Sequence, residues 1–271
     1  MAESINNDLD LARRFGGVSR LYGADGLAKL QSAHICIIGI GGVGSWAAEA
    51  IARNAVGTIT LIDLDNIAES NVNRQLHALD GAFGKAKVTA MAERILLINP
   101  TVNITEIEDF VTAENVHVML NHHFDGVIDC IDDAKAKMAV AAYCKQKQMP
   151  LVVVGGAGGR LDPTKIKKAD LSVVTGDRLL AKVRNGLRRD YGFPKGEQLK
   201  SKTTTFGITA IYSDEVSIKP NDVCEAETDG NNSSADAITG LNCAGYGSSV
   251  CVTAPFGFAA AAHLIQQILA K

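Results

Sequence analysis

The chain has 271 residues, of which 46% are hydrophobic and 21% are charged, and these fractions are ordinary for a soluble globular protein. The net charge of −3 does not by itself predict a polyanionic partner, although a mean charge can hide a local basic patch. None of the 6 cysteines forms a C-x-x-C pair, so the sequence does not support a tetrahedral zinc site. The N-terminal residues lack the apolar segment of a signal peptide, and we therefore expect a reducing, cytoplasmic location.

The first predicted elements form a nucleotide-binding unit. Residues 5–32 are predicted to be helical in part, and a short apolar run at 34–38 predicts a buried strand. A glycine-rich turn, a helix, a second strand at 59–62 and an acidic residue come next, with the key positions at Gly39, Gly41, Gly42, Gly44 and Asp63. Glycines let the backbone approach a phosphate at a helix N-terminus, and the acidic residue is placed to accept a hydrogen bond from a ribose hydroxyl.

The identity of the nucleotide depends on the residues after Asp63. NAD is the default for such a unit, but a dehydrogenase does not need the polar cluster SNVNRQ at residues 70–75, which contains Asn71, Arg74 and Gln75. A helix predicted over 83–98 carries Lys85 and Lys87 in its first turn. A lysine there opposes the helix dipole unless an anion lies near, so the pattern indicates phosphate.

Two adjacent carboxylates, Asp132 and Asp133, come directly after the strand predicted at 126–131. Acidic residues at the carboxyl end of a parallel strand lie where ligands bind in open α/β sheets, and they suit Mg²⁺ bound together with nucleotide phosphates. The alternative is an N-cap of the helix predicted over 134–148, and one aspartate can cap while the other faces the metal. Further predicted elements are strands at 102–107 and 151–154 and a helix at 113–120.

Residues 160–202 are basic, with 12 Lys and Arg against 5 Asp and Glu, a surplus of +7. An amphipathic helix is predicted within residues 177–192, and its basic residues give either a solvated face or a surface for RNA or an acidic protein. The candidates for tRNA contact are Arg178, Lys182, Arg184, Arg188 and Arg189. Residues 221–240 are polar and predict a flexible loop.

The segment 237–270 contains no Asp, Glu, Lys or Arg, and a hydropathy window identifies it as a possible membrane span. Its glycines, serines and Pro255 favour instead a buried strand or loop up to Pro255, followed by a closing helix to about Leu269. The predicted fold is therefore α/β, with a Rossmann-like, mostly parallel sheet and flanking helices. We expect a single domain with an N-terminal arm at 1–32, a nucleotide-binding core at 33–157 and a C-terminal extension at 158–271.

Five motifs in order and spacing resemble the ubiquitin-activating-enzyme-like superfamily of adenylating enzymes: GIGGVG at 39–44, LIDLD at 61–65, SNVNRQ at 70–75, GKAK at 84–87 and DCIDD at 129–133. Within it, the chain looks most like the tRNA threonylcarbamoyladenosine dehydratases, through RFGGVSRLYG at 14–23, GGAGGRLDPTKI at 155–166 and TAPFGFAAAAH at 253–263. The zinc motifs common in the superfamily are absent.

The resemblance implies a role for individual residues. Asp63, with Asp65 nearby, would hold the ATP ribose, Asn71 and Arg74 would contact the phosphates, and Gln75 would line the same site. Lys87 would neutralise charge at the α-phosphate, and Asp132 would bind Mg²⁺. An arginine from the partner subunit of a homodimer can complete such a site, and Arg20, or else Arg14, is the candidate. Without the resemblance, the sequence favours an arm whose arginines face solvent over one that reaches into a neighbouring site.

The implied reaction is ATP-dependent cyclisation of threonylcarbamoyladenosine beside a tRNA anticodon, through adenylation of its carboxylate. Alternatives are adenylation of a sulfur-carrier protein's C-terminus, an NAD-dependent oxidoreductase, and a non-catalytic partner of a cysteine desulfurase. Cys243 is the one candidate thiol, but cyclisation does not formally need it, and we interpret it as structural.

Overall fold

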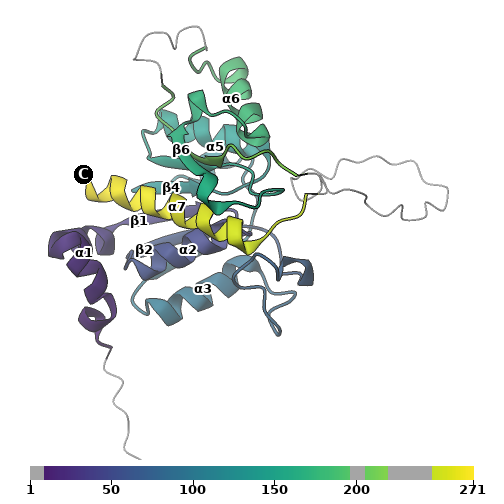
Figure 1. Cartoon of the computed structure of the whole chain (residues 1–271). Coiled ribbons are helices and arrows are strands. Elements are labelled where there is room, and N and C mark those ends of the chain that lie inside the picture. Colours follow the sequence, from purple (N-terminus) through teal and green to yellow (C-terminus); the bar gives the residue numbers. More distant parts are fainter. Residues whose placement is uncertain (1–8, 196–204, 219–245) are drawn as a thin grey trace, which may run out of the picture.

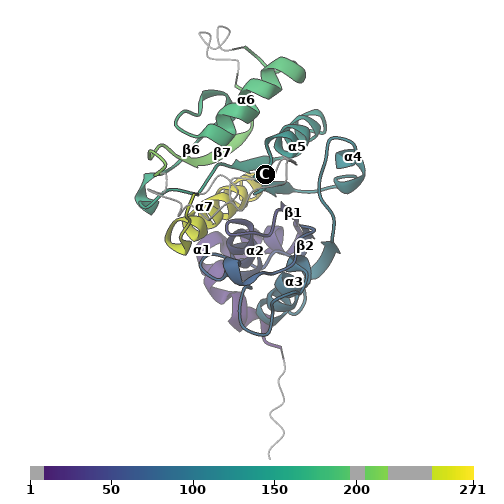
Figure 2. The ribbon, with the colours of Figure 1, turned by 90° about the vertical axis from the view of Figure 1, so that its right-hand side faces the viewer.

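The computed structural model describes residues 9–195, 205–218 and 246–271, which form one sheet with helices on both faces (Figures 1 and 2). Within these residues the strand order is β3-β2-β1-β4-β5-β7-β6. All neighbouring strands are parallel except β6, which runs antiparallel to β7. The strands are β1 (His34–Ile38), β2 (Thr58–Ile62), β3 (Asn103–Ile107), β4 (Gly126–Asp129), β5 (Leu151–Val154), β6 (Ile166–Asp170) and β7 (Thr209–Ser213).

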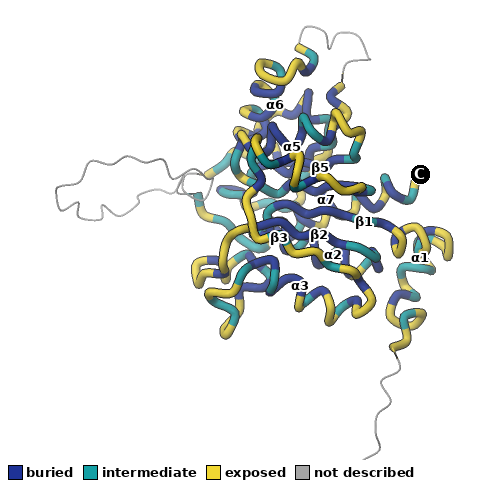
Figure 3. Tube along the Cα trace, turned by 180° about the vertical axis from the view of Figure 1, so that it is seen from behind, coloured by how far each residue is buried: buried dark blue, intermediate teal, exposed yellow. Residues whose placement is uncertain are grey.

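The helices divide into two layers that bury separate hydrophobic clusters. One cluster joins α2, α3 and α7 to one face of the sheet, and the other joins α4, α5 and α6 to the opposite face. Figure 3 shows the central strands as the most buried part of the chain. The α-helices are α1 (Leu11–Ser32), α2 (Gly44–Arg53), α3 (Lys87–Ile98), α4 (Val116–Met119), α5 (Ala134–Gln146), α6 (Arg178–Asp190) and α7 (Val250–Leu269), with short 3₁₀ turns η1 (Glu69–Asn71), η2 (Pro163–Lys165) and η3 (Leu171–Val173).

The position of the site is set by the strand order. The chain runs outward from β1 to β2 and β3, and then returns to place β4 on the other side of β1. This reversal opens a crevice beyond the carboxyl ends of β1 and β4, which is where ligands bind in sheets of this kind. The predicted mostly parallel α/β sheet with flanking helices is thus confirmed.

Two strands were absent from the sequence prediction. β6 reads IKKAD and has an irregular, half-exposed pattern, because it is the edge strand of the sheet. β7 reads TAIYS and is buried between β5 and β6. Neither segment has the long apolar run of a central parallel strand, so their pairing is visible only in three dimensions.

Two predicted boundaries were wrong. The helix predicted from residue 83 begins at Lys87, because residues 84–86 form turns and an isolated bridge between Asn66 and Ala86. The strand or loop expected up to Pro255 is helix, since α7 begins at Val250 with Ser249 as its N-cap. Pro255 lies in the second turn of α7, where its missing N–H removes one intrahelical bond, the one to the carbonyl oxygen of Cys251.

α7 passes the length and composition test for a membrane span, with a mean hydropathy of 1.2 over its apolar window. This helix packs against α2 in the core cluster, where Phe256, Ala260 and Leu264 are fully buried. A buried core helix passes the same test, so the contacts agree with the interpretation of this segment as core.

Candidate functional site

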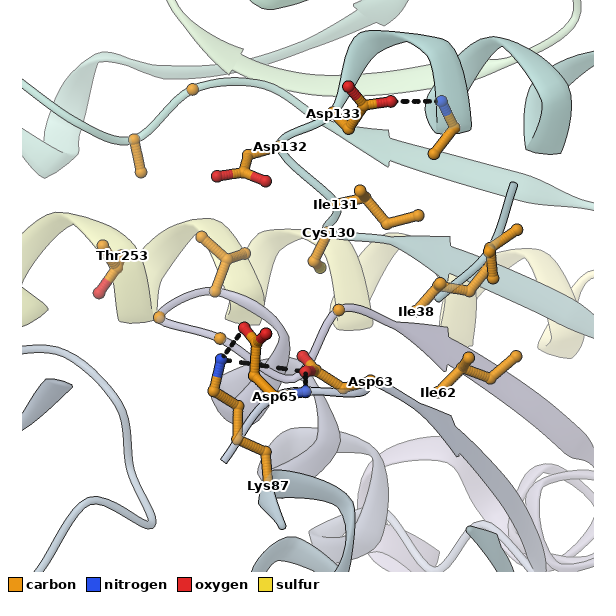
Figure 4. A pocket seen from close by; sticks show the side chains of 18 of the residues that line it. Ile38, Ile62, Asp63, Asp65, Lys87, Cys130, Ile131, Asp132, Asp133 and Thr253 are labelled. Carbon is orange, nitrogen blue, oxygen red and sulfur yellow. Dashed lines mark hydrogen bonds and ion pairs between the residues drawn. The ribbon is translucent and has the colours of Figure 1, made fainter. Parts of the chain in front are cut away.

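A cavity of about 420 Å³ opens at the carboxyl edge of the sheet (Figure 4). Its walls are the turns after five neighbouring strands: Gly39 and residues 41–43 after β1, Asp63 and Asp65 after β2, residues 109–112 after β3, residues 130–133 after β4 and residues 155–158 after β5. The loop carrying Arg74 and Gln75, the first residue of α3 and the start of α7 complete it. Most sequence-predicted nucleotide residues therefore line one cavity.

The glycine-rich turn has two positions that no other residue can occupy without rearrangement. Gly39 has a φ of +83°, a conformation that residues with a Cβ rarely adopt. A Cβ on Gly44 would lie 1.8 Å from the carbonyl oxygen of Gly39, so α2 begins in direct contact with the turn. Gly42 is also close-packed, because its Cβ would lie 3.0 Å from the side chain of Arg74.

Asp63 is held rigidly at the end of β2. Its Oδ2 accepts a hydrogen bond of 2.6 Å from the backbone N–H of Ile40, and its Oδ1 accepts one of 2.9 Å from that of Asp65. Burial raises the pKa of the Asp63 carboxyl, while the ammonium of Lys87 and the two backbone donors oppose the rise. An oriented carboxylate of this kind can accept a hydrogen bond from a ribose hydroxyl.

The ammonium of Lys87 lies beside the carboxylates of Asp63 and Asp65 (Figure 4). Its Nζ is 2.6 Å from Asp65 Oδ2 and 3.9 Å from Asp63 Oδ1, and its side chain is 7% exposed. These carboxylates compensate the unfavourable position of a lysine at the first residue of α3, so the helix dipole alone does not require a phosphate here. Lys85 precedes the helix and pairs with Glu93 at 2.8 Å, which separates it from the cavity.

The loop SNVNRQ is fixed from several sides. Asn71 is buried, and its Oδ1 accepts a hydrogen bond of 3.0 Å from the backbone N–H of Ala68. Arg74 Nη1 donates to the carbonyl oxygen of Ser70 at 2.7 Å and to Asn73 Oδ1 at 2.9 Å. Burial lowers the pKa of Arg74. The guanidinium therefore lies at the cavity rim with its position set by its own loop.

Buried polar atoms next to this loop have no partner in the described part of the chain. They are Gln75 Oε1, both ring nitrogens of His77, and Thr253 Oγ1. Burial lowers the pKa of His77 to about 4, and the positive charge of Lys87 contributes to the shift. His77 was not predictable from the sequence, because a lone histidine beside an apolar residue belongs to no motif.

Both adjacent aspartates line the cavity, but only Asp133 also caps a helix. Asp133 caps α5, accepting a hydrogen bond of 2.7 Å from the backbone N–H of Ala136. Asp132 lines the cavity, is exposed, and has no hydrogen-bond or ion-pair partner among residues 9–195, 205–218 and 246–271. Asp132 is thus the carboxylate left free for a ligand.

A buried ion pair joins the strand before the loop that carries Asp132 and Asp133 to the helix after it. Lys137 and Asp129 are both 0% exposed, and Lys137 Nζ lies 2.9 Å from Asp129 Oδ1 and 2.9 Å from its carbonyl oxygen. Asp129 Oδ1 also accepts a hydrogen bond from the N–H of Ile131 at 3.0 Å. Sequence reasoning missed this pair, since Lys137 looks like one of several lysines on an amphipathic helix.

The candidate arginines of the arm do not line the cavity of their own chain. α1 leads directly into the first residue of β1, whereas the cavity lies beyond the last, so the arm and the cavity are at opposite edges of the sheet. Arg14 Nη1 donates to the carbonyl oxygens of Leu97 and Ile98 at 3.1 and 2.7 Å, at the end of α3. Arg20 is exposed.

The basic residues of α6 fall into two groups. Arg184 donates to the carbonyl oxygen of Val174, and Arg188 donates to those of Pro194 and Ser172, both at 3.1 Å. The second group consists of Arg178, Lys182 and Arg189, of which Arg189 pairs with Asp190 at 2.7 Å. Only this second group presents its charge to an external ligand.

Some predictions fall outside the described residues. Cys243 and the loop predicted at 221–240 lie in the segment 219–245, whose structure is not described. Among the described residues, no group of three or more His, Cys, Asp or Glu side chains is arranged to hold a metal ion. A magnesium site at Asp132 would therefore draw its other ligands from a nucleotide and water, as Mg²⁺ commonly does.

Comparison with known proteins identifies the family. Residues 14–271 match the model of the ThiF family. The chain is 46% identical to a tRNA threonylcarbamoyladenosine dehydratase of Haemophilus influenzae, an alignment that covers 96% of this chain and 94% of the relative. It is 43% identical to a protein of the same name from Escherichia coli, with the same coverage.

Solved structures agree with this result. The crystal structure of the Escherichia coli tRNA N6-threonylcarbamoyladenosine dehydratase in complex with ATP superposes with a TM-score of 0.83 at 41% identity, covering 96% of this chain and 95% of that one. The complex of the same enzyme with AMP gives a TM-score of 0.82. The chain therefore belongs to the ThiF family, among the tRNA threonylcarbamoyladenosine dehydratases.

Proposed function

We propose that this protein uses ATP to dehydrate N6-threonylcarbamoyladenosine in tRNA to its cyclic form. The observation that carries the proposal is the pairing of Asp63 with Lys87 on one wall of a cavity that faces the free carboxylate of Asp132. This arrangement suits a nucleotide with its ribose at Asp63 and its α-phosphate between a cation and a metal-binding carboxylate. The similarity to named dehydratases along 96% of the chain supports the substrate.

The reaction divides into two steps. The threonyl carboxylate attacks the α-phosphorus of ATP, and the bond to the β-phosphate breaks with release of pyrophosphate. A nitrogen of the ureido group then attacks the carbonyl carbon of the mixed anhydride, loses its proton, and expels AMP. The two steps together remove one water from the nucleoside. Because the nucleophile belongs to the same side chain, proximity replaces a second substrate and lowers the barrier by several kcal/mol.

The side chains of the cavity stabilise the charge that moves in the first step. Lys87 would neutralise the α-phosphate, and Arg74 would receive the leaving pyrophosphate. Asn71 is buried and does not line the cavity, so its contribution would be to hold the loop that carries Arg74. Lys87 Nζ lies 2.6 Å from Asp65 Oδ2, so a phosphate bound at Lys87 would share the ammonium with that carboxylate. Gln75 and the glycines 39, 41, 42 and 44 complete the nucleotide contacts.

Mg²⁺ is the metal that this donor set fits. Asp132 would hold it with one carboxylate, and the ion would neutralise charge on the ATP phosphates. Asp133 does not share this role, since its carboxylate caps α5. The ion pair of Lys137 with Asp129 orients the aspartate loop.

The tRNA is expected to contact the outward-facing charges of α6, namely Arg178, Lys182 and Arg189.

We further propose a cytoplasmic homodimer in which Arg20 of one subunit, or else Arg14, completes the phosphate site of the other. Arg14 is the weaker candidate because it already binds the carbonyl oxygens at the end of α3. A complex with a cysteine desulfurase and a structural role for Cys243 also remain proposals.

The domain division is a proposal as well. We take residues 1–271 as a single domain with an arm at 1–32, a core at 33–157 and an extension at 158–271. The extension supplies β6 and β7 to the sheet that the core begins, and α7 to the face that α2 and α3 cover. These shared layers support one domain rather than two.

The test is a comparison of two substrates. With ATP, Mg²⁺ and tRNA that carries threonylcarbamoyladenosine, the protein should form the cyclic nucleoside with AMP and pyrophosphate in equal amounts. With a sulfur-carrier protein that ends in Gly-Gly, it should not exchange pyrophosphate into ATP. Exchange that requires the carrier and ignores tRNA would replace the proposal with carrier activation.

A further inference from the structure

A buried arginine lies behind the cavity wall formed by residues 155–158. Arg160 is 3% exposed, although it belongs to the basic segment. Its Nε donates to the carbonyl oxygen of Gly156 at 2.9 Å, its Nη1 donates to that of Glu215, and its Nη2 donates to that of Gly176 at 3.4 Å. A buried guanidinium needs such partners, so one side chain fixes the relative positions of three separate segments.

Asp177 is the buried counterion of Arg160. Its Oδ2 lies 3.6 Å from Arg160 Nη2 and accepts a hydrogen bond of 2.9 Å from the N–H of Gly156. Its Oδ1 accepts a hydrogen bond of 2.9 Å from the N–H of Leu180, which makes Asp177 the N-cap of α6. A Cβ on Gly155 would lie 2.3 Å from Asp177 Oδ2, so the cavity wall and the start of α6 are in direct contact.

The backbone N–H and carbonyl oxygen of Gly156 therefore both hold the cavity wall in place. The N–H of Gly156 binds Asp177 and its carbonyl oxygen binds Arg160, which leaves no freedom for this part of the cavity to shift alone. Gly159 extends the connection, because it accepts from the N–H of Ile218 and donates to the carbonyl oxygen of Gly247, both at 2.8 Å. The cavity wall, the first turn of α6 and the entry to α7 form one connected unit.

This unit carries charge on its outer side. Arg178 comes directly after Asp177, is exposed, and donates from Nη1 to the hydroxyl oxygen of Tyr246 at 3.0 Å. Lys182 lies one turn further along α6 and is also exposed. A polyanion bound at these two residues is thus connected to the cavity wall through Asp177 and Arg160.

We propose that Arg160 is a positioning residue for the tRNA half of the reaction, an inference that rests on the proposed function. Arg160 and Asp177 hold the wall at 155–158 and the first turn of α6 in one arrangement, so that RNA bound at α6 presents its modified nucleoside to the cavity. Asp63 and Lys87 stand on the β2 side and contact neither member of the pair in the described residues. ATP affinity should therefore depend on Arg160 much less than the reaction with tRNA does.

The experiment compares Arg160→Met with Arg53→Met. Both changes remove an arginine from an ion pair, but Arg53 is exposed and its partner Glu49 keeps a second arginine, Arg94. Dissociation constants for ATP come from calorimetry, and kcat and KM for tRNA from mass spectrometry of nucleosides. We expect Arg160→Met to lower kcat/KM for tRNA by about tenfold or more, as small misplacements do, with ATP affinity unchanged within about twofold. Arg53→Met should match the wild type in both measurements.

A second variant keeps the proposal testable if Arg160→Met fails to fold. Asp177→Asn retains one side-chain oxygen that can accept the hydrogen bond from the N–H of Leu180, but its amide nitrogen cannot accept the one from the N–H of Gly156. This variant should show the same selective loss of kcat/KM for tRNA. Wild-type kcat/KM for tRNA in both variants, or a parallel loss of ATP affinity, would overturn the positioning role. A wild-type protein that does not cyclise the nucleoside defeats the proposed function itself, so the two failures are distinguishable.

Discussion

The two sides of the cavity are built in different ways. On the β1–β2 side, the glycine turn, Asp63 and Lys87 come from a contiguous part of the chain between residues 34 and 98, and each contact joins neighbours in that stretch. On the β5–β7 side, residues 155–160, 176–180, 213–218 and 246–248 come together only through long-range contacts around Arg160. The first side holds the residues that we propose for the nucleotide, and the second holds those that we propose to position the substrate.

The difference predicts that damage to the first side stops nucleotide chemistry. Gly44→Ala should have the largest effect, because its Cβ would lie 1.8 Å from the carbonyl oxygen of Gly39. We expect a loss of about 3 kcal/mol of unfolding free energy or no detectable ATP binding. Gly17→Ala is the matched control, since Gly17 lies in α1 and its Cβ would meet Arg20 Nη2 at an unstrained 4.0 Å, and it should stabilise by about 0.5–1 kcal/mol. Urea denaturation measures both, and equal effects would refute the close contact at Gly44.

The second prediction separates two lysines that are two residues apart. Lys87→Ala should lower kcat for cyclisation by about 10²–10³-fold, because it removes the cation assigned to the α-phosphate. Lys85→Ala should leave kcat near the wild-type value, since Lys85 pairs with Glu93 on the surface. Single-turnover assays with saturating ATP and tRNA measure the difference. Similar rates for the two variants would remove Lys87 from the catalytic group.

The third prediction concerns His77 and pH. Its folded pKa of about 4 is below its unfolded value of 6.5, so the unfolded state binds more protons between these values and stability falls as the pH is lowered through that window. The loss at pH 4 should be about 3 kcal/mol. His77→Leu should lack this component and be nearly neutral at pH 7, because both ring nitrogens lack partners among the described residues.

Urea denaturation of both proteins at pH 7 and pH 4 isolates the contribution of His77 from that of other groups. The wild type should lose about 3 kcal/mol more than His77→Leu over this range. Parallel losses would show that His77 is protonated without penalty in the folded protein.

The smallest expected effects are at the surface of α6. Arg178→Ala and Lys182→Ala should each weaken tRNA binding a few-fold and reduce the slope of log K against log salt by about 0.7. Arg188→Ala should leave the slope unchanged and lower stability, because its guanidinium binds the carbonyl oxygens of Ser172 and Pro194. Fluorescence anisotropy across a salt series measures the slopes, and a uniform slope for all three variants would place the tRNA elsewhere.

The same contrast explains how far the sequence predicted the structure. Strands at 34–38, 59–62 and 151–154 and the cavity residues Asp63, Arg74, Lys87 and Asp132 were predictable, because short apolar runs and fixed spacings encode them locally. The extra strands β6 and β7 were not, since one is a half-exposed edge and the other depends on β5 for its pairing.

Buried charge was the other gap in the prediction. Lys137 and Arg160 read as surface residues, since most lysines and arginines face solvent. Their burial is decided by distant partners: Asp129 for Lys137, and Asp177 with three backbone carbonyl oxygens for Arg160. No local pattern contains that information, and only the folded chain shows which charges turn inward.

Mass spectrometry of tRNA nucleosides tests the central claim most directly. After incubation of this protein with ATP, Mg²⁺ and tRNA that carries threonylcarbamoyladenosine, the nucleoside should lose the mass of one water, with AMP and pyrophosphate formed in equal amounts. Omission of ATP should abolish the shift, and the change Lys87→Ala should slow it by about 10²–10³-fold. Recovery of only the open nucleoside, from active protein that binds ATP, would contradict the account.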